Sequence, residues 1–531
     1  MMSTSSPPNH FLPNWGLACC LLLLGSVVVA MPTRRDLQRR KVLQDQEMSL
    51  WVGGSGEGLN DREKLVDKLI VEEKKRLITS ARLNKAPFPP RDNFFLSRAE
   101  METTTAFKVI REMPKGGVLH VHDEAITSID WVVKNVTYRP NCYMCVDASY
   151  NVEFHFFSIP PKNTDCTWRL VSEYRQRSED AEAFDQRLHA NLTLLAASRD
   201  VHAAYPNSDA AWEEFTAYFR KIEGLMLYAP VFQDYLYEGL RQFREDGVQY
   251  LEIRALLPQV YELDGKTHDK ATVLGIYKKV INQFVADFPD FTGARIINIA
   301  VRFKEKSLML EDIKQAAALY QSDPGFMVGF DLVGHEDPLN PLSYYFEELQ
   351  YPSQQNPPIQ LPYFFHAGET NWEGTAVDYN LLDAILLGTK RIGHGYALLK
   401  HPVLMEKAKE MNIAVELNPI SNQILKLVDD LRNHPGAVLI ANGFPVVISS
   451  DDPVVWGALP LTHDFYVTFM TMMGADMGLA TLKKLALNSL EYSALSQTEK
   501  QTAIQSWRLK WDSFIRNTIQ KYDLEHLFPV G

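Results

Sequence analysis

The sequence predicts a (β/α)8 barrel, also called a TIM barrel, and two observations lead to it. From Phe107 onward, eight short apolar runs rich in β-branched residues alternate with longer segments of helical periodicity. Each run is followed by a loop that contains Gly, His, Asp or Asn, as expected where barrel strands end at the catalytic rim. A doubly wound parallel sheet has the same alternation and is the alternative.

Residues 1–30 are predicted to be a secretory signal peptide. The block "WGLACCLLLLGSVVVA" (residues 15–30) is short for a bilayer span and has the length of a signal-peptide core. Val28 and Ala30 are small residues suited to cleavage after Ala30. No Lys or Arg precedes the block, so an uncleaved signal anchor is the alternative. No later segment is long and apolar enough to span a membrane.

Residues 31–105 are predicted to form an N-terminal helical extension. Apolar residues recur at helical spacing between positions 60 and 85, and charged residues lie between them. The prolines of "PFPP" (residues 87–90) end this helix. Its apolar face has to be buried, either on the barrel or on a second subunit.

Residues 106–531 are predicted to form the barrel. Helix-compatible segments such as 377–387 and 402–411 follow the apolar runs. The eight expected strands are 117–121, 250–254, 294–301, 328–332, 361–365, 391–392, 413–417 and 446–448.

Residues 135–195 interrupt this rhythm and are predicted to be an inserted subdomain. The segment holds the three cysteines that remain after signal removal, Cys142, Cys145 and Cys166, and glycosylation sequons at Asn135 and Asn191. Three cysteines in an oxidising compartment suggest one disulfide and one free thiol. A zinc knuckle at the Cys-x-x-Cys pair is the competing interpretation, but no second pair is present to complete four ligands.

The composition is that of a globular protein without a dedicated nucleic-acid surface. The 531-residue chain has a net charge of −12 and a pI near 5.7, whereas phosphate binding requires clustered Lys and Arg. The lysine-rich run "EEKKR" (residues 72–76) contains acids and has a helical pattern, which is typical of a solvated helix face.

A candidate metal site begins in "VLHVHDE". His120 and His122 are two residues apart on an expected strand, so their side chains point to the same side. Alone, this pair is equally compatible with two polar residues on one strand face. However, "YFFHAGET" places His366 and then Glu369 after another apolar run, and "RIGHGYAL" and "VVISSDDP" do the same for His394 and Asp451. Ligand-type residues at four strand ends favour one shared site at the rim.

The chemistry that these residue types suit is hydrolysis assisted by zinc. His120, His122, His366 and Asp451 would supply three imidazole nitrogens and one carboxylate, which is a coherent set of zinc ligands. Zinc lowers the pKa of a bound water to about 7. Glu369 could protonate the substrate if desolvation raises its pKa, and His394 with Asp451 could orient the water and take its proton.

The motifs together resemble the adenosine/AMP deaminases of the amidohydrolase superfamily. The resemblance rests on "MPKGGVLHVHDE", "GFDLVGHED", "FFHAGET", "RIGHGYAL", "NPISNQ" and "ISSDDP", in this order. With the signal peptide, helical extension and cysteine-bearing insertion, the chain is more closely similar to the secreted adenosine deaminases, also called adenosine deaminase-related growth factors. This similarity covers essentially the whole chain after the signal.

The resemblance implies a role for each site residue. His120, His122, His366 and Asp451 would bind one zinc ion per subunit, and Glu369 would protonate N1 of the purine. His394 would position the hydroxide that attacks C6, which yields inosine and ammonia. The residues implied in substrate binding are Asp123 and Trp212 at the ribose, the backbone of Gly334 at the base, and Asp452 as a hydrogen-bond acceptor toward N7.

The resemblance also implies an assembly and a disulfide. The family forms a homodimer partly through the helices before the barrel, and its insertion is expected to contact a cell-surface receptor or a glycosaminoglycan. The pairing implied is Cys145 with Cys166, which leaves Cys142 unpaired. One departure is Val301 in "AVRF", where members of the secreted family carry a substrate-contacting histidine, so ribose recognition or turnover is expected to differ.

The expected function is therefore extracellular deamination of adenosine and 2′-deoxyadenosine, with lysosomal residence left open. Two alternatives remain. One is a secreted signalling protein whose barrel has weak or altered deaminase activity. The other is deamination of adenine, AMP or an oligonucleotide, although no basic cluster for a phosphate stands out.

Overall fold

The computed structural model describes residues 34–54, 58–147, 152–162, 166–178, 180–194 and 200–527. The chain divides into two units, Met1–Met48 and Ser49–Gly531. The described part of the first unit belongs to helix α1 (Arg34–Leu50). The expected signal peptide lies outside the described residues. Among the described helices, none combines the length and apolar character needed to cross a bilayer.

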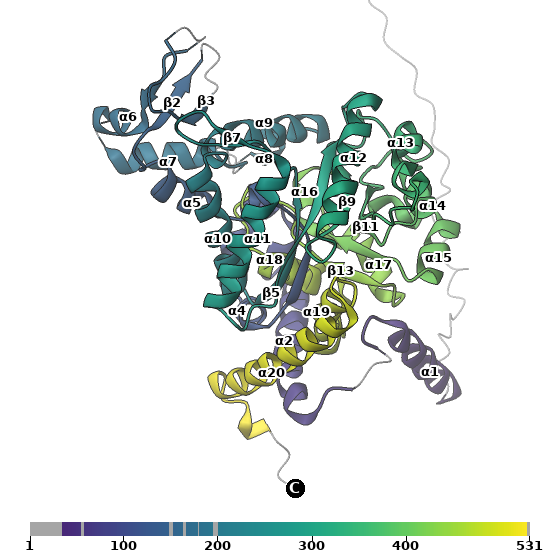
Figure 1. The fold of residues 1–531 in the computed structure, drawn as a ribbon. Helices are drawn as coiled ribbons and strands as arrows, with labels where there is room; N and C mark the ends of the chain where they lie inside the picture. Colours follow the sequence, from purple (N-terminus) through teal and green to yellow (C-terminus); the bar gives the residue numbers. More distant parts are fainter. Residues whose placement is uncertain are drawn as a thin grey trace, which may run out of the picture. The chain divides into compact units, whose positions relative to one another are not determined.

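Eight parallel strands form the centre of the second unit, as the sequence predicts. They are hydrogen-bonded in two four-stranded sheets, ordered β1-β5-β8-β9 and β10-β11-β12-β13. Figure 1 shows strands of both sheets in the interior of the unit, with helices outside them. Their bounds are β1 (Gly116–His122), β5 (Val248–Ala255), β8 (Gly293–Val301), β9 (Met327–Val333), β10 (His366–Ala367), β11 (Arg391–His394), β12 (Ala414–Leu417) and β13 (Val446–Ile448).

Two parallel bridges join the sheets into a closed barrel. Phe330 of β9 pairs with Tyr363 ahead of β10, and Val121 of β1 pairs with Asp451 after β13. The closure excludes the doubly wound alternative, in which a sheet keeps two free edges. The fifth strand differs from its predicted range of 361–365, because the regular ladder covers only β10. Pro362 lies in the predicted range and has no N–H to donate to a ladder.

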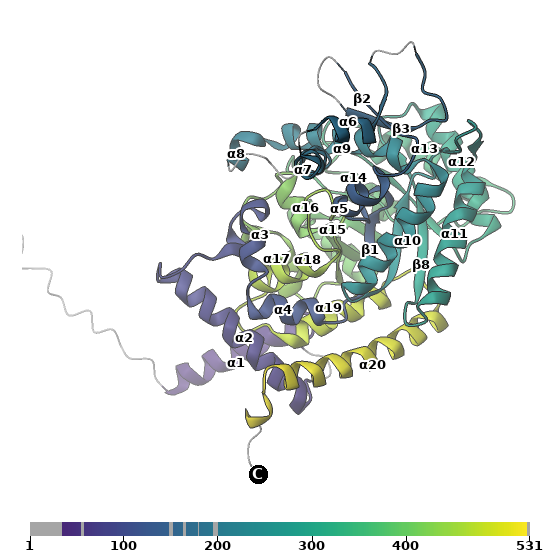
Figure 2. The same ribbon diagram turned by 90° about the vertical axis from the view of Figure 1, so that its left-hand side faces the viewer.

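Helices cover the outside of the barrel. Figures 1 and 2 both place α19 and α20 at the end of this unit that is farther from strands β2 and β3. From α10 onward the helices are α10 (Ala229–Glu245), α11 (Lys270–Asp287), α12 (Lys306–Ser322), α13 (Phe346–Gln350), α14 (Asn380–Leu386), α15 (Pro402–Glu410), α16 (Pro419–Ile424), α17 (Gly436–Ala441), α18 (Thr462–Val467), α19 (Leu479–Glu491) and α20 (Gln497–Lys521).

Three helices precede the barrel within the second unit: α2 (Asp61–Arg82), α3 (Phe94–Met101) and α4 (Thr105–Glu112). Helix α2 starts with a capping box, in which the Asn60 side chain accepts from the Glu63 N–H and the Glu63 carboxylate accepts from the Asn60 N–H. Its buried residues include Leu65, Val66 and Ile70. It packs on α4, α19 and α20, so its apolar face is buried within the chain.

The segment predicted as an insertion forms a small sheet with helices. Strands β2 (Cys142–Val146), β3 (Val152–Phe156) and β4 (Arg169–Leu170) form an antiparallel sheet ordered β3-β2-β4. Helices α6 (Val171–Arg177) and α7 (Ala181–Asn191) follow it. Cys145 and Cys166 form a disulfide, and Cys142 is buried and free. The sheet packs on helix α9 (Ser208–Met226) where a Cβ at Gly224 would overlap the Phe154 carbonyl oxygen, so only glycine permits this approach.

The barrel interior contains charged side chains as well as apolar ones. Arg254 donates to Asp331 and Glu416 at 2.8 Å each, and Arg391 donates to Glu416 at 2.6 Å and to Glu252. All five side chains are at most 1 % exposed. Buried charges are tolerated where partners satisfy them, and this network lies directly beneath the candidate site.

Candidate active site

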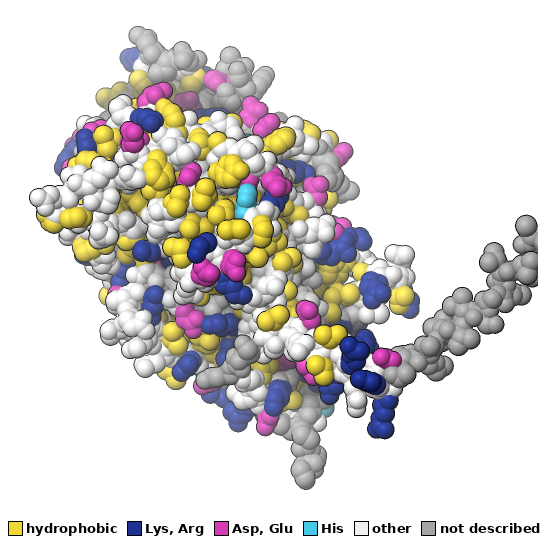
Figure 3. Space-filling model, turned by 90° about the vertical axis from the view of Figure 1, so that its right-hand side faces the viewer, with side chains coloured by type: hydrophobic (Ala, Val, Ile, Leu, Met, Phe, Trp, Pro, Cys, Tyr) yellow, Lys and Arg dark blue, Asp and Glu magenta, His cyan; other side chains and the backbone are white. Residues whose placement is uncertain are grey.

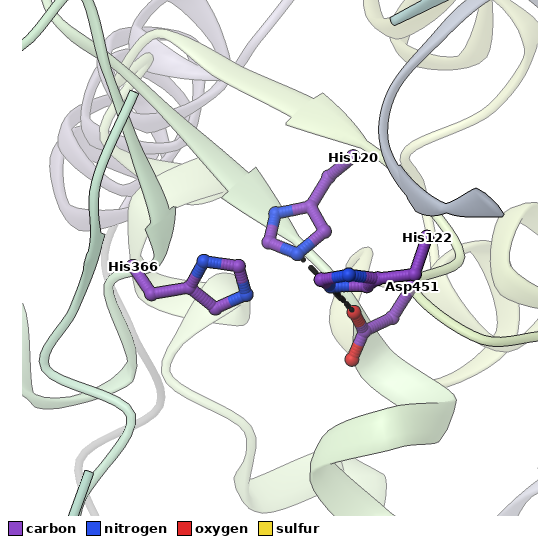
Figure 4. A group of neighbouring side chains, drawn as sticks. All are labelled: His120, His122, His366 and Asp451. Carbon is purple, nitrogen blue, oxygen red and sulfur yellow. Dashed lines mark ion pairs between the residues drawn. The ribbon is translucent and has the colours of Figure 1, made fainter. Parts of the chain in front are cut away.

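The first and last strands of the barrel bring three predicted ligands together. His120 and His122 lie at the end of β1, and Asp451 follows β13. The Nε2 atoms of both histidines lie 3.2 Å from Asp451 Oδ1, and Figure 4 shows both rings directed at this carboxylate. The Asp451 N–H donates to the His120 carbonyl, and the His122 N–H donates to the Asp451 carbonyl, each at 3.1 Å. The bonds that close the barrel therefore also fix these side chains.

His366 completes the group from the first position of β10. One ligand atom from each of His120, His122, His366 and Asp451 lies within 4.8 Å of the others. Gly393 explains how the rings approach so closely, because a Cβ there would lie 3.1 Å from both His120 Cε1 and His366 Cα. The group contains three imidazole nitrogens and one carboxylate, and it is able to hold a metal ion.

Two buried carboxylates orient the histidines of this group. Glu416 Oε2 lies 2.8 Å from His120 Nδ1, and Asp331 Oδ2 lies 2.6 Å from His366 Nδ1. Burial alone would raise the pKa of each carboxyl, but Arg254 and Arg391 hold that of Glu416 well below its usual value, and His366 and Arg254 lower that of Asp331. An ionised carboxylate only accepts, so each Nδ1 carries the proton and each Nε2 lone pair is free for a metal.

Protonation states in the group also suit metal binding. Burial lowers the pKa of His122, and it lowers the pKa of His366 to about 3, so both rings are neutral at physiological pH. Burial would raise the pKa of Asp451, but its contacts with His120 and His122 hold it well below the usual value. His120 Nε2 is fully buried without a hydrogen-bond partner among the described residues. A bound cation would satisfy this atom, so the residues present fit a metal.

Glu369 and His394 form a second group with Asp451. Glu369 Oε1 lies 3.3 Å from His394 Nδ1, and His394 Nε2 lies 3.7 Å from Asp451 Oδ2. Burial, followed by the charges of Asp451 and Glu336, raises the pKa of Glu369 well above its usual value. Burial lowers the pKa of His394 well below its usual value. Glu369 is thus able to carry a proton at neutral pH while the neighbouring imidazole stays neutral.

A cavity of about 700 Å³ opens onto these residues at the carboxyl ends of the strands. Apolar side chains from β8 and the residues beside it, including Val301 and Phe303, form one wall. Carboxylates and aromatic side chains from β1 and α9 line the other parts. The predicted site residues that line the cavity are His122, Asp123, Trp212, Gly334, His366, Glu369, His394, Asp451 and Asp452.

The four residues predicted to bind substrate are held in different ways. The Tyr277 hydroxyl donates to Asp123 Oδ2. Trp212, on α9, stacks on His335 with ring centroids 4.5 Å apart and an interplanar angle of 7°. Gly334 follows β9 at a φ of +107°, which favours glycine. Burial and the neighbouring Asp451 raise the pKa of Asp452 well above its usual value.

The predicted glycosylation residues lie outside this cavity. Asn135 is exposed, and its side-chain amide donates to the Trp131 carbonyl at 3.1 Å. Asn191 is the last residue of α7 and is partly buried.

The residues that support the site are not predicted from the sequence. Glu416 and Asp331 lie inside predicted strands, and a single acid in an otherwise apolar parallel strand is a signal for an interior partner. Ser421 and Asn422 of α16 belong to "NPISNQ", and the motif alone predicts no role for either residue. The Ser421 hydroxyl donates to Asp451 Oδ2 at 2.7 Å, and the Asn422 side chain lies 3.0 Å from His394 Nδ1.

Comparison with known proteins finds a matching family model and relatives that cover most of the chain. The family model described as adenosine deaminase matches residues 191–507. The chain is 46 % identical over 501 residues to adenosine deaminase 2-A of Danio rerio, with 94 % of this chain and 96 % of that protein covered. It is 42 % identical over 518 residues to adenosine deaminase 2 of Homo sapiens, with 96 % and 99 % covered.

Solved structures share the fold at lower identity. An amidohydrolase from Burkholderia ambifaria, solved with bound Zn, superimposes with a TM-score of 0.51 and 16 % identity. The match covers 82 % of this chain and 99 % of that one. At this identity the likeness establishes the barrel fold and no more.

Proposed function

This chain belongs to the adenosine deaminase family, and from that premise we propose that it hydrolyses adenosine to inosine and 2′-deoxyadenosine to 2′-deoxyinosine, with release of ammonia. The observation that carries the proposal is the convergence of His120, His122, His366 and Asp451 with Glu369 and His394 at one cavity. Hydrolytic loss of ammonia from C6 requires an activated water and a proton donor to the purine, which a metal group and a neighbouring protonated acid can supply.

The metal proposed is one zinc ion per chain. Its ligands would be Nε2 of His120, His122 and His366 and a carboxylate oxygen of Asp451, and it would supply a water acidic enough to ionise near neutral pH. Three nitrogens and one oxygen favour zinc over magnesium or calcium, which prefer oxygen ligands.

The protein's own residues then act on the substrate. Glu369 delivers its proton to N1 of the purine, which makes C6 more electrophilic. His394 hydrogen-bonds the attacking oxygen, and Asp451 Oδ2, which faces His394 Nε2, accepts the proton that this oxygen releases. Asp451 then passes this proton to the amino group, and the tetrahedral carbon expels ammonia. The proton of the new C6 hydroxyl returns to Glu369, which leaves the C6 carbonyl of the product. The apolar wall around Val301 excludes water from the face of the base.

Asp452 binds N7 as a donor, which is the reverse of the hydrogen bond expected from the resemblance. N7 of adenosine carries no hydrogen and can only accept, and the raised pKa of Asp452 lets its carboxyl keep a proton. Its Oδ1 is buried without a hydrogen-bond partner among the described residues. Asp123 and Trp212 are proposed to contact the ribose, and the Gly334 backbone the base.

The cavity favours nucleosides over nucleotides. Its lining contains seven acidic side chains and one arginine, Arg220. Glu369 and Asp452 are proposed to be protonated, but the five other acids still outnumber this arginine, so a phosphate would meet repulsion. The acids are Asp123, Glu124, Asp209, Glu213, Glu369, Asp451 and Asp452. AMP and oligonucleotides are therefore weaker candidates than adenosine.

The protein is further proposed to be secreted, glycosylated and dimeric. Supporting features are the apolar block at residues 15–30, the disulfide between Cys145 and Cys166, and the exposed position of Asn135. We propose that helices before the barrel contribute to a homodimer and that the disulfide-bearing segment binds a cell-surface receptor or a glycosaminoglycan.

The proposal is tested by assaying the purified protein on adenosine, 2′-deoxyadenosine, adenine and AMP while measuring its metal content. The expected result is ammonia release from the two nucleosides with one zinc per chain. Turnover of AMP or adenine alone would reject the nucleoside assignment. Active protein without stoichiometric zinc would reject the metal assignment.

A further inference from the structure

Behind His394, on the side away from the metal group, a chain of buried polar groups runs through three elements. Asn422 of α16 places Nδ2 3.0 Å from His394 Nδ1. Asn422 Oδ1 lies 2.9 Å from Nε2 of His434, which sits in the loop before α17. The Gly436 N–H donates to His434 Nδ1 at 2.9 Å. His394, Asn422 and His434 are each at most 1 % exposed, so water cannot substitute for any member.

The direction of this chain is fixed at its far end. A backbone N–H can only donate, so His434 Nδ1 is an acceptor and carries no proton. Burial lowers the pKa of His434 to about 3, which keeps the ring neutral, with its single hydrogen on Nε2. The donor approaches closely because residue 436 is glycine: a Cβ there would lie 2.9 Å from His434 Nδ1.

Each hydrogen bond then determines the next. His434 Nε2–H donates to the partner atom of Asn422, which must be the carbonyl oxygen Oδ1. The amide orientation of Asn422 follows, and Nδ2 faces His394 and donates to Nδ1. A neutral imidazole with an accepting Nδ1 carries its hydrogen on Nε2. That nitrogen faces the metal group, with Asp451 Oδ2 3.7 Å away.

We propose that His434, acting through Asn422, is a positioning residue that holds the ring hydrogen of His394 on Nε2. The inference rests on the proposed function only for its effect on turnover. The groups that face His394 are His120, His366, Glu369, Asp451 and the Asn418 amide, whose Nδ2 lies 3.4 Å from Nε2. Because Nε2 donates, Asn418 has to present its carbonyl oxygen there, and this oxygen otherwise lacks a partner among the described residues.

In the reaction, the position of this hydrogen gives His394 and Asp451 separate roles. With hydrogen on Nε2, His394 can donate a hydrogen bond to the attacking oxygen and so direct a lone pair of this oxygen at C6. The same nitrogen cannot accept a proton, because it already carries one. Proton acceptance then falls to Asp451. With hydrogen on Nδ1, the ring would turn a lone pair toward the attacking oxygen and lose the orienting bond.

The test compares three variants. His434→Phe keeps a ring against Tyr396 but removes the donor to Asn422. His434→Gln retains an amide N–H near the position of Nε2 and serves as the conservative control. Asn422→Asp places an acceptor opposite His394 Nδ1 and reverses the hydrogen position. Expected kcat falls are about 10–100-fold for His434→Phe and larger for Asn422→Asp, with KM changed less than about 2-fold, and His434→Gln should restore most of the loss.

Nitrogen-15 NMR of histidine-labelled, zinc-loaded protein reads the position of the hydrogen directly. The His394 signals are assigned by their loss in His394→Gln. We expect a protonated Nε2 in wild type and a protonated Nδ1 in Asn422→Asp. A protonated Nδ1 in wild type would overturn the inference. So would unchanged kcat in folded His434→Phe, or a loss that His434→Gln leaves uncorrected. Wild-type protein inactive on adenosine would reject the proposed function instead, and the NMR result would still decide the hydrogen position.

Discussion

Glu369 is positioned to act as an acid because its carboxyl is buried near other carboxyls, and the imidazole beside it, His394, stays neutral. Burial and the charge of Asp451 favour its protonated form, and Oε1 lacks a hydrogen-bond partner among the described residues. Glu369→Gln retains the shape of the side chain but has no proton to transfer. Its kcat on adenosine should fall about 10²–10⁴-fold, with KM changed little, as measured by ammonia release.

The matched control for this substitution lies on the same loop. Glu373 is exposed and does not line the cavity, so Glu373→Gln should keep wild-type kcat. Equal losses in both variants would mean that the loop is disturbed and would contradict the acid role of Glu369. Melting temperature and circular dichroism verify that both variants are folded.

The metal group shows which site residues can be predicted from residue type and position in the sequence alone. His120, His122, His366 and Asp451 could be chosen from sequence because few residue types bind zinc and all four follow apolar runs. Asn422 could not, because an asparagine side chain supports many local hydrogen bonds and only the fold brings it to His394. The direction proposed for the Asp452 hydrogen bond rests on the burial of its carboxyl, which only the fold reveals.

At the scale of helices, Asp464 of α18 gives a pH-dependent test of burial. Its Oδ1 accepts from the Ile420 N–H at 3.2 Å, but Oδ2 has no hydrogen-bond partner among the described residues. Burial raises its pKa well above 3.8, so the folded state holds a proton that the unfolded chain releases above that pH. The wild type therefore loses stability as pH rises, by up to about 1.4 kcal/mol per pH unit.

Asp464→Asn removes this titration and keeps an acceptor for Ile420. Its stability relative to wild type should increase as pH rises from 5 to 8, as measured by urea unfolding at each pH. The same substitution at exposed Asp512 is the control and should show no such trend. A pH-independent difference at Asp464 would contradict the assignment of a protonated, buried carboxyl.

The disulfide links Cys145 of β2 to Cys166, 21 positions later, and so closes a covalent loop within the small subdomain. Closing a loop of this length stabilises the folded state by about 3 kcal/mol in the chain-entropy description. A reductant should therefore lower the free energy of unfolding of wild type by about that amount. The double variant Cys145→Ser/Cys166→Ser should start from the lower value and show no response to reductant.

Strands were predicted well where both faces of the strand are buried. Barrel strands are covered on both sides, so they appear as continuous apolar runs, and seven of the eight predicted ranges overlap an observed strand. The range of β10 was predicted wrongly because the apolar run 361–365 contains a proline and forms only an isolated bridge, between Tyr363 and Phe330, instead of a regular ladder. Strands β2, β3 and β4 were not predicted, since short antiparallel strands in a small subdomain leave weak periodicity.

For the whole molecule, metal binding should contribute to both activity and stability. A ligand that binds only the folded state at 1,000 times its dissociation constant adds about 4 kcal/mol. Removing the metal with a chelator should therefore abolish turnover and lower the melting temperature, and added zinc should restore both. His366→Asn is the control, since its melting temperature should not respond to the chelator.

Barrel closure has a consequence for how the active protein is made. The carboxylate of Asp451 enters the site only when its backbone bonds to β1, whereas His120 and His122 lie near the start of the barrel sequence. Bringing together residues so far apart in the sequence costs loop-closure entropy, so this contact is expected to form late in folding. A growing polypeptide on the ribosome thus carries half of its ligands long before the rest exist. High-affinity zinc uptake then reports that the chain has been made past Asp451 and that the barrel has closed, so chains that end before Asp451 should not hold the metal tightly.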